Sequence, residues 1–310
     1  MAKPQYNNKK LIESIKRRCS IPTSQLTYTD EDFILLANDE LQGEVVPLIM
    51  STREEYFVEY IDVISDSTGI IPIPSQAVGA KLRSVAQVQN ADNLTLINLP
   101  LINLDVIAGI GVGGLSSSSG FYIQNNSICL YPNLSMSGLL IRLYYYKRTL
   151  MLAEPSMYGQ ITSINVATST IVLNNLPTSW VVGDKINAIS QDPNFKLTME
   201  EATITVLSSP SVVLSSVIGL NVGDYISLMG YSSIPQIPVE AHAYLAQLTA
   251  AKALEGLGDR EGMKAALEKA NSLKDSLLIM TSSRVDGSPK KIVSPNGGVK
   301  RASSLRGRGF

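Results

Sequence analysis

TIVLNNLPTSWVVGDKI (residues 170–186) and SVVLSSVIGLNVGDYI (residues 211–226) are two versions of one pattern. In each, a short run of β-branched residues is followed by VGD and a second apolar run, and the two Gly-Asp pairs lie 40 residues apart. We interpret each copy as a hairpin plus a further strand that begins after a Gly-Asp turn. Two such units together bury faces that one unit alone would expose. The repeat therefore predicts a small all-β barrel or sandwich over residues 156–235.

Prolines and extended segments flank this repeat. Pro155 precedes it, and Pro235 and Pro238 follow it, which is typical of the boundaries of an inserted domain. Upstream, the prolines in IIPIP (residues 70–74) favour extended backbone. Short apolar runs follow up to LLIRLYYY (139–146), the strongest strand pattern in the chain, with a predicted hairpin turn at Asn125-Asn126.

Helical patterns lie on both sides of the β-rich part. We predict a short basic helix over 11–19. A second helix begins after Thr29, which together with Asp32 matches a capping box, and continues with a kink or break at Gly43 and Pro47. Its apolar spacing extends to Ile64, and residues 65–69 end it. After residue 239, two further helical segments are separated by Gly258, a predicted C-terminal cap, and Asp259, a predicted N-cap.

Together these patterns predict an α+β fold, in which a helical bundle is split across the chain and joined to an antiparallel β domain and an inserted small all-β barrel or sandwich. The expected parts are an N-terminal helical segment (1–69), an antiparallel β region (70–154), the inserted β domain (156–235), a helical hairpin that completes the bundle (236–282) and an extended basic tail (283–310).

Charge is distributed unevenly along the 310 residues. Residues 1–18 carry a net charge of +5 and residues 287–310 carry +6, so the remainder carries −12 in a chain whose total is −1. Apolar residues make up 45% and charged residues 17%, which excludes a wholly disordered chain. An acidic body with two basic ends suggests ends that meet a negatively charged partner.

Catalysis has no positive support in the sequence. The single histidine, His242, and the two cysteines, Cys19 and Cys129, are too few for most metal sites, and we expect both cysteines to be buried or free thiols. GIGVGG (109–114) has dinucleotide-site spacing, but four serines and a glycine follow it, which would not begin a helix. We predict no catalytic residue, no cofactor and no metal.

Three further motifs have a structural interpretation beside the functional one. The Gly-Asp pairs lack the dense acidic loop that calcium needs, so we interpret them as turns. YYYKR (144–148) could stack nucleic-acid bases, but a strand with one ring in the core is the more common arrangement. Residues 94–115 are apolar yet interrupted by polar residues, and no signal peptide is visible, so we expect a protein made in the cytosol that does not enter a membrane.

A set of stretches outside the repeat matches a known layout. They are DEDF (30–33), VPLIM (46–50), EY (55–56), TGIIPIP (68–74), AKLRSV (80–85), NSICLYP (126–132), LYYY (143–146), IPVEA (237–241) with its helical hairpin, and RVDGSP (284–289). With them, roughly residues 28–154 and 236–293 resemble the head-to-tail connector (adaptor, or neck-ring) proteins of tailed bacteriophages, especially short-tailed ones.

The resemblance implies a virion structural protein at the head-tail junction. Such proteins form a ring, commonly of twelve copies, which docks beneath the portal of the DNA-filled head, receives a tail or nozzle protein below and lets DNA pass without sequence preference. Their extended C-terminal segments typically dock on the portal, and residues 294–310 match that role by composition and position. Here the residues expected to meet portal or DNA are Lys300, Arg301, Arg306, Arg308 and Phe310.

Alternatives from other classes stay open at this point. The chain could be another tail, collar or head-surface component of the virion. It could be a host- or carbohydrate-binding module that uses residues 156–235, although Trp180 is the single tryptophan available for stacking on a sugar. A hydrolytic enzyme is a third alternative, supported only by the abundance of Asp and Ser.

Overall fold

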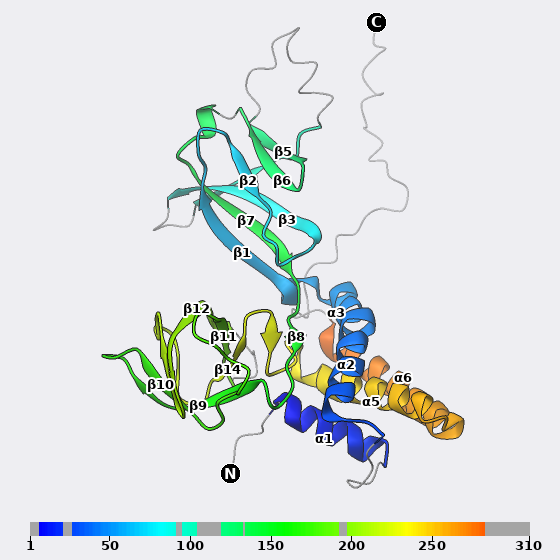
Figure 1. Cartoon of the computed structure of the whole chain (residues 1–310). Helices are drawn as coiled ribbons and strands as arrows, with labels where there is room; N and C mark the ends of the chain where they lie inside the picture. Colours follow the sequence, from blue (N-terminus) through cyan, green and yellow to red (C-terminus); the bar gives the residue numbers. More distant parts are fainter. Residues whose placement is uncertain are drawn as a thin grey trace, which may run out of the picture.

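The computed structural model describes residues 6–20, 27–90, 95–103, 119–132, 134–191 and 197–282. These residues form three lobes: a helical bundle, a β lobe of two facing sheets and a closed β-barrel (Figure 1). The predicted α+β class is therefore confirmed, and the inserted β unit is a barrel rather than a sandwich.

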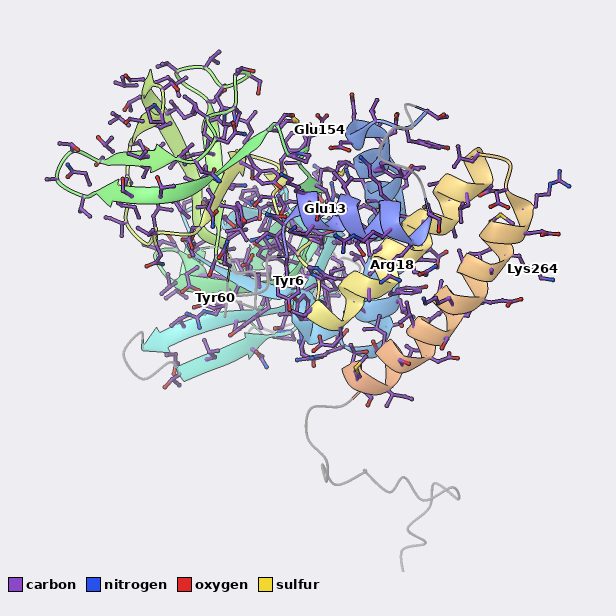
Figure 2. The ribbon with its side chains drawn as sticks, turned by 90° about the horizontal axis from the view of Figure 1, so that it is seen from below. Tyr6, Glu13, Arg18, Tyr60, Glu154 and Lys264 are labelled. Atoms are coloured by element: carbon purple, nitrogen blue, oxygen red, sulfur yellow. The ribbon has the colours of Figure 1, made fainter. Side chains whose placement is uncertain are left out.

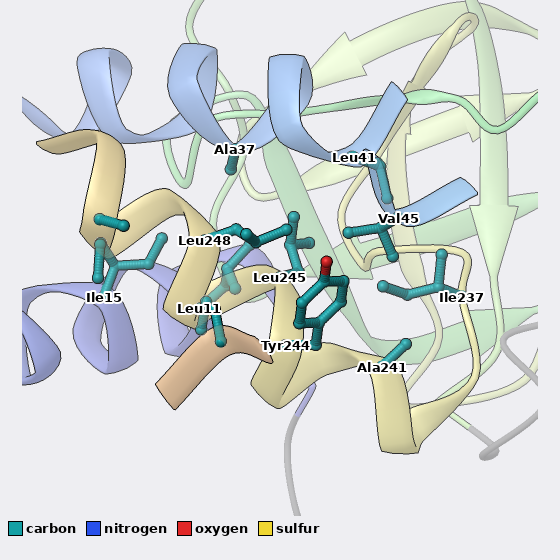
Figure 3. Close-up of a cluster of buried hydrophobic side chains, with 14 of the residues drawn as sticks. Leu11, Ile15, Ala37, Leu41, Val45, Ile237, Ala241, Tyr244, Leu245 and Leu248 are labelled. Carbon is teal, nitrogen blue, oxygen red and sulfur yellow. The ribbon is translucent and has the colours of Figure 1, made fainter. Parts of the chain in front are cut away.

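The bundle is assembled from both ends of the described chain. Its elements are α1 (Asn8–Arg18), α2 (Asp30–Glu40), a π-helical turn (Leu41–Val45), α3 (Val46–Thr52), α5 (Val239–Gly256) and α6 (Arg260–Thr281). Helix α5 contacts α1, α2 and α6, and its central part, Tyr244–Ala251, is buried on all sides (Figure 3). A helix that is apolar all round is stable only when other elements surround it, so α5 is the axis of the bundle.

Local capping explains where three helices begin or end. The Thr29 hydroxyl accepts from the backbone N–H of Asp32, and the Asp32 carboxylate accepts from that of Thr29, which confirms the predicted capping box. Gly258 has φ +78° and follows α5, and Asp259 accepts from the N–H of Gly262 at the start of α6. Both predicted caps of the helical hairpin are therefore confirmed.

The predicted helix through Ile64 is wrong, and so is the assignment of all of residues 1–69 to the helical part. The α-helix ends at Thr52, a 3₁₀ turn spans Glu54–Phe57, and β1 is Val58–Ile64. The apolar spacing fits a helix, but valine, isoleucine and tyrosine also favour strands. Residues 58–64 form a strand because they make seven antiparallel residue pairs with β7 (Leu140–Lys147).

The β lobe consists of two sheets that share one core. One sheet has the order β1-β7-β3-β4 and the other the order β2-β6-β5. The remaining strands are β2 (Ile70–Pro72), β3 (Ala77–Asn90), β4 (Thr95–Leu99), β5 (Gly120–Gln124) and β6 (Ser127–Tyr131), with a 3₁₀ turn at Leu134–Met136. Asn125 and Asn126 have φ +49° and +56° between β5 and β6, as the hairpin prediction requires.

The barrel closes in the order β10-β13-β12-β11-β14-β9. Its strands are β9 (Tyr158–Asn165), β10 (Thr170–Leu173), β11 (Lys185–Ile189), β12 (Leu197–Ser208), β13 (Ser211–Leu214) and β14 (Tyr225–Leu228). Each repeat lies in one half of the barrel, with β9, β10 and β11 in the first half and β12, β13 and β14 in the second. The halves join through the pairs β10–β13, β11–β12, β11–β14 and β9–β14. Within each half only the hairpin strands pair with one another, and the third strand, β11 or β14, pairs only with strands of the other half, so closure removes every unpaired strand edge.

The Gly-Asp turns occupy corresponding places in the two halves. Gly183 N–H donates to the carbonyl of Ile204 at 2.9 Å, and Gly223 N–H donates to that of Ile161 at 2.8 Å. Each glycine has a φ near +100°, a conformation that residues with a Cβ rarely adopt. The repeat therefore encodes both the turn and the pairing that closes the barrel.

The segments that lead into and out of the barrel lie side by side. They form a two-residue parallel pair, β8 (Met151–Leu152) with β15 (Tyr231–Ser232), at the centre of the molecule (Figure 1). Next to it, the Asn8 side chain donates to the carbonyls of Ala153 and Ser232 at 2.7 and 2.8 Å. Helix α1 thus holds both segments in place.

Candidate assembly surfaces

The residues proposed to meet portal or DNA fall in a part of the chain that the structure does not describe. Lys300, Arg301, Arg306, Arg308 and Phe310 lie beyond residue 282, and the Gly-rich run 109–114 also lies outside the described residues. Within the described part, no group of three or more His, Cys, Asp or Glu side chains could hold a metal ion, and no helix is long and apolar enough to cross a membrane.

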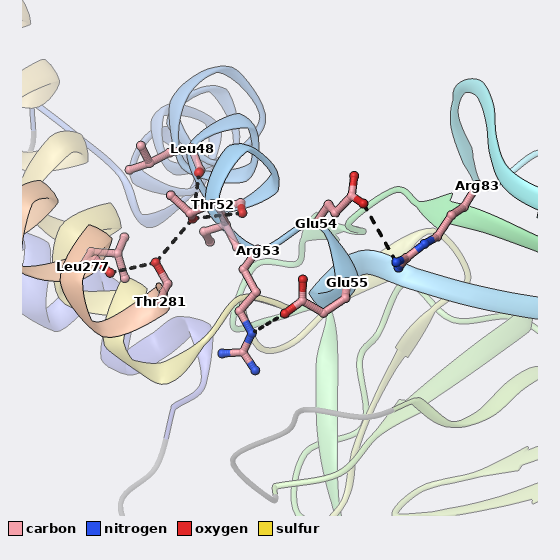
Figure 4. Close-up of polar contacts among 9 residues, drawn as sticks. Leu48, Thr52, Arg53, Glu54, Glu55, Arg83, Leu277 and Thr281 are labelled. Carbon is pink, nitrogen blue, oxygen red and sulfur yellow. Dashed lines mark hydrogen bonds and ion pairs between the residues drawn. The ribbon is translucent and has the colours of Figure 1, made fainter. Parts of the chain in front are cut away.

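The chain leaves the described body at the junction between bundle and β lobe. The Thr281 hydroxyl, at the end of α6, lies 3.4 Å from the Thr52 hydroxyl at the end of α3, and each also donates to a carbonyl of its own helix (Figure 4). Immediately after α3, Glu54 lies 4.0 Å from Arg83 on β3. The last described residues of the chain therefore lie where two lobes meet.

The three tyrosines 144–146 have partners within the β lobe. Tyr145 lies in its hydrophobic core. Tyr146 is buried, donates to Glu54 at 2.8 Å and has the Lys81 ammonium 4.6 Å from its ring centre. The Tyr144 ring packs against Tyr60 at 5.8 Å. This arrangement supports the structural interpretation over base stacking.

The outer face of the four-stranded sheet carries one partly buried ion pair. The Arg142 guanidinium donates two hydrogen bonds, at 2.7 and 2.8 Å, to the Asp62 carboxylate, and it lies 4.2 Å from the Tyr60 ring centre. These bonds hold the pKa of Asp62 below its usual range. The face around the pair is exposed, with Tyr60 54% and Ile64 70% accessible.

Asp62→Asn is expected to lower the free energy of unfolding by about 1–3 kcal/mol, because a largely buried guanidinium loses its charged acceptor. Urea unfolding measures the change. The matched control is Asp275→Asn, which removes an exposed carboxylate from α6. Equal, small effects of both substitutions would contradict a structural role for the pair.

His242 lies in the first turns of α5, where its ring packs edge-on against Tyr6 at a centroid distance of 5.5 Å. Burial lowers the pKa of its imidazole from 6.5 to about 4, so the ring is neutral at pH 7. The folded state therefore binds this proton less well than the unfolded state does. The contribution of the neutral His242 ring to the free energy of unfolding is therefore fully present above pH 6.5, and it is lost as the pH falls toward 4.

We expect His242→Gln to reduce this pH dependence. The difference in unfolding free energy between wild type and variant should shrink as the pH falls from 6.5 to about 4, measured by urea unfolding at several pH values. A constant difference across that range would show that His242 does not contribute.

The Gly-Asp aspartates and the cysteines have structural positions. Asp184 accepts the backbone N–H of Val181 at 2.9 Å, and Asp224 accepts that of Asn221 at 3.0 Å, so both pairs are turns, as predicted. Cys19 and Cys129 are buried free thiols, also as predicted. Trp180 is 4% exposed in the barrel core and cannot stack on a sugar there.

No protein-family model matches this chain, and no curated protein matches it.

Proposed function

We propose that this protein is a subunit of a ring-forming head-to-tail adaptor in the virion of a tailed bacteriophage. Its partners are further copies of itself, the portal protein above and a tail or nozzle protein below, and the ring leaves a channel for DNA. The protein acts at the head-tail junction by binding rather than by catalysis.

The observation that carries the proposal is the separation of a folded acidic body from a basic C-terminal end. Residues 1–286, which include the basic helix α1, carry a net charge of −7, while residues 287–310 carry +6 without one acidic residue. The last described residues, Thr281 and Ser282, lie beside the junction of bundle and β lobe. A segment with the composition of residues 287–310 has no core of its own and is suited to docking on a larger partner.

The acidic body also suits a DNA channel. Lys and Arg side chains that contact phosphates release counterions and retain DNA strongly, in a salt-dependent way. A channel wall with few free cations would let DNA pass. The burial of Trp180 takes support away from the carbohydrate-binding alternative, because the single indole is unavailable to a ligand.

Light-scattering mass, measured on the purified protein alone and mixed with the portal protein of the same phage, tests the proposal. The expected result is a closed ring, alone or on the portal, whose mass is a whole multiple of 33.5 kDa and which electron micrographs show as an annulus. A protein that stays monomeric and ignores the portal would overturn it.

A further inference from the structure

A groove of about 280 Å³ runs between α1 and α5. The α1 side presents Lys10, Ser14 and Arg18, which share one helix face, and the α5 side presents the small residues Ala243 and Ala246. Figure 2 shows Arg18 near the end of α1, beside α5. We call this the α1–α5 groove.

Arg18 in this groove is a partly buried cation with neutral partners. Its guanidinium donates to the Gln247 amide oxygen at 2.6 Å and to the Ser14 hydroxyl at 3.3 Å. Within the described part of the chain, no carboxylate lies within 4.0 Å of it. Burial lowers the pKa of Arg18, as expected for a cation that loses water without gaining an opposite charge.

Acidic residues that complement the charge of Arg18 lie on α2 and the π-helical turn. Asp39, Glu40 and Glu44, which we call the acidic flank, take part in none of the ion pairs found among the described residues. Glu40 is 9% exposed. Burial raises its pKa, Lys252 offsets part of this effect, and Glu44 and Asp39 raise the pKa further.

The groove and the acidic flank lie on opposite sides of α5. The α5 residues that line the groove include His242, Ala243 and Ala246, and those near the acidic flank are Tyr244, Lys252 and Glu255. At roughly 100° per residue, these two sets are centred about 180° apart around the helix axis. One copy therefore cannot join its own groove to its own acidic flank.

We propose that the α1–α5 groove of one copy receives the acidic flank of the next copy, with Arg18 facing Glu40 and Glu44. Such a contact joins two different surfaces, so its repetition gives a head-to-tail assembly, which is a closed ring where the rotations between copies add up to a full turn. Each contact supplies Arg18 with an opposite charge that it lacks within one copy, and it adds a closer cation to Glu40, which otherwise feels only Lys252 at longer range. The inference rests on the proposed ring and names the surfaces that form it.

The test uses charge-reversed variants of the full-length protein. Arg18→Glu and Glu44→Arg should each weaken association between copies by about a hundredfold, because each places like charges opposite one another. The double variant Arg18→Glu/Glu44→Arg restores an opposite charge at position 44 of every contact, although Glu40 stays acidic, and its association should return to within about tenfold of wild type. Light-scattering mass across a dilution series, alone and on the portal protein, measures the change.

Matched controls separate the contact from general charge effects. Arg17→Glu makes the same charge change on the next residue of α1, which does not line the groove, and Glu31→Arg does so on α2 outside the acidic flank. Both should assemble nearly as wild type does. Arg18→Gln keeps a polar group near Gln247 and tests the same contact if Arg18→Glu does not fold. Circular dichroism checks the fold of every variant.

The outcomes distinguish this inference from the proposed function. A wild-type ring that is disrupted by either reversal and restored by the double variant supports the contact. A wild-type ring that persists in folded Arg18→Glu and Arg18→Gln overturns the contact but leaves the adaptor proposal in place. A wild-type protein that forms no ring even with the portal overturns both.

Discussion

Phe33→Ala is expected to lower the free energy of unfolding of the bundle by about 3–5 kcal/mol, the range for removing a fully buried phenylalanine ring. Phe33 is 0% exposed, its ring lies 5.6 Å from that of Tyr28, and the Lys16 ammonium lies 5.5 Å from the ring centre. Truncation leaves a cavity in the core that α1, α2 and α5 share. Little in a packed helical core can move to fill it.

Two signals allow this effect to be assigned to the bundle. Helical circular dichroism reports α1, α2, α5 and α6, while the fluorescence of Trp180, the single tryptophan, reports the barrel core. We expect the helical transition in urea to move to lower concentration and the Trp180 transition to move less. Leu35→Ala is the matched control, because Leu35 lies on the same helix but is 54% exposed. Equal effects of the two substitutions would contradict the assigned core.

Removal of residues 294–310 is expected to weaken portal binding by at least about tenfold, a loss of about 1.4 kcal/mol or more. The segment carries Lys300, Arg301, Arg306 and Arg308 and no acid, so its attraction to an acidic surface is lost as a whole. The described body ends at residue 282, so its thermal unfolding should be unchanged. A pull-down with the portal protein at two salt concentrations measures the binding.

Two variants separate the contribution of charge to portal binding by the tail from the contribution of apolar contact. Glutamine at all four cationic positions should weaken binding and remove its salt dependence. Phe310→Ala should weaken binding while the salt dependence stays. Undiminished portal binding by the truncated chain would exclude the tail as the portal contact. The proposed ring would then still be tested separately, by light-scattering mass.

The inserted β domain was predictable as a small barrel or sandwich, because the residues that specify its turns are local in the sequence and occur twice. The choice of a closed barrel depends on strand pairs between the two units, which the periodic sequence does not specify. The error at residues 58–64 has the opposite cause. Their pattern fits either element locally, and pairing with residues 140–146, distant in sequence, selected the strand.

The candidate surfaces were less accessible to sequence reasoning. The α1–α5 groove joins helices from opposite ends of the chain, and the Arg142–Asp62 pair spans 80 positions, so neither contact follows from local spacing. A signal for the groove does exist in the sequence. Asn7, Lys10, Ser14 and Arg18 recur at three- and four-residue steps, which places a polar stripe on the side of α1 that faces α5.

The parallel pair of β8 and β15 has a consequence for how such a protein can evolve. Because the chain enters and leaves the barrel at adjacent positions, the whole unit is topologically a single loop of its host. A gene segment encoding this loop can be gained, lost or exchanged for another module without rethreading the bundle. The barrel is therefore the part in which we expect related lineages to differ most, while the bundle that holds its base stays recognisable.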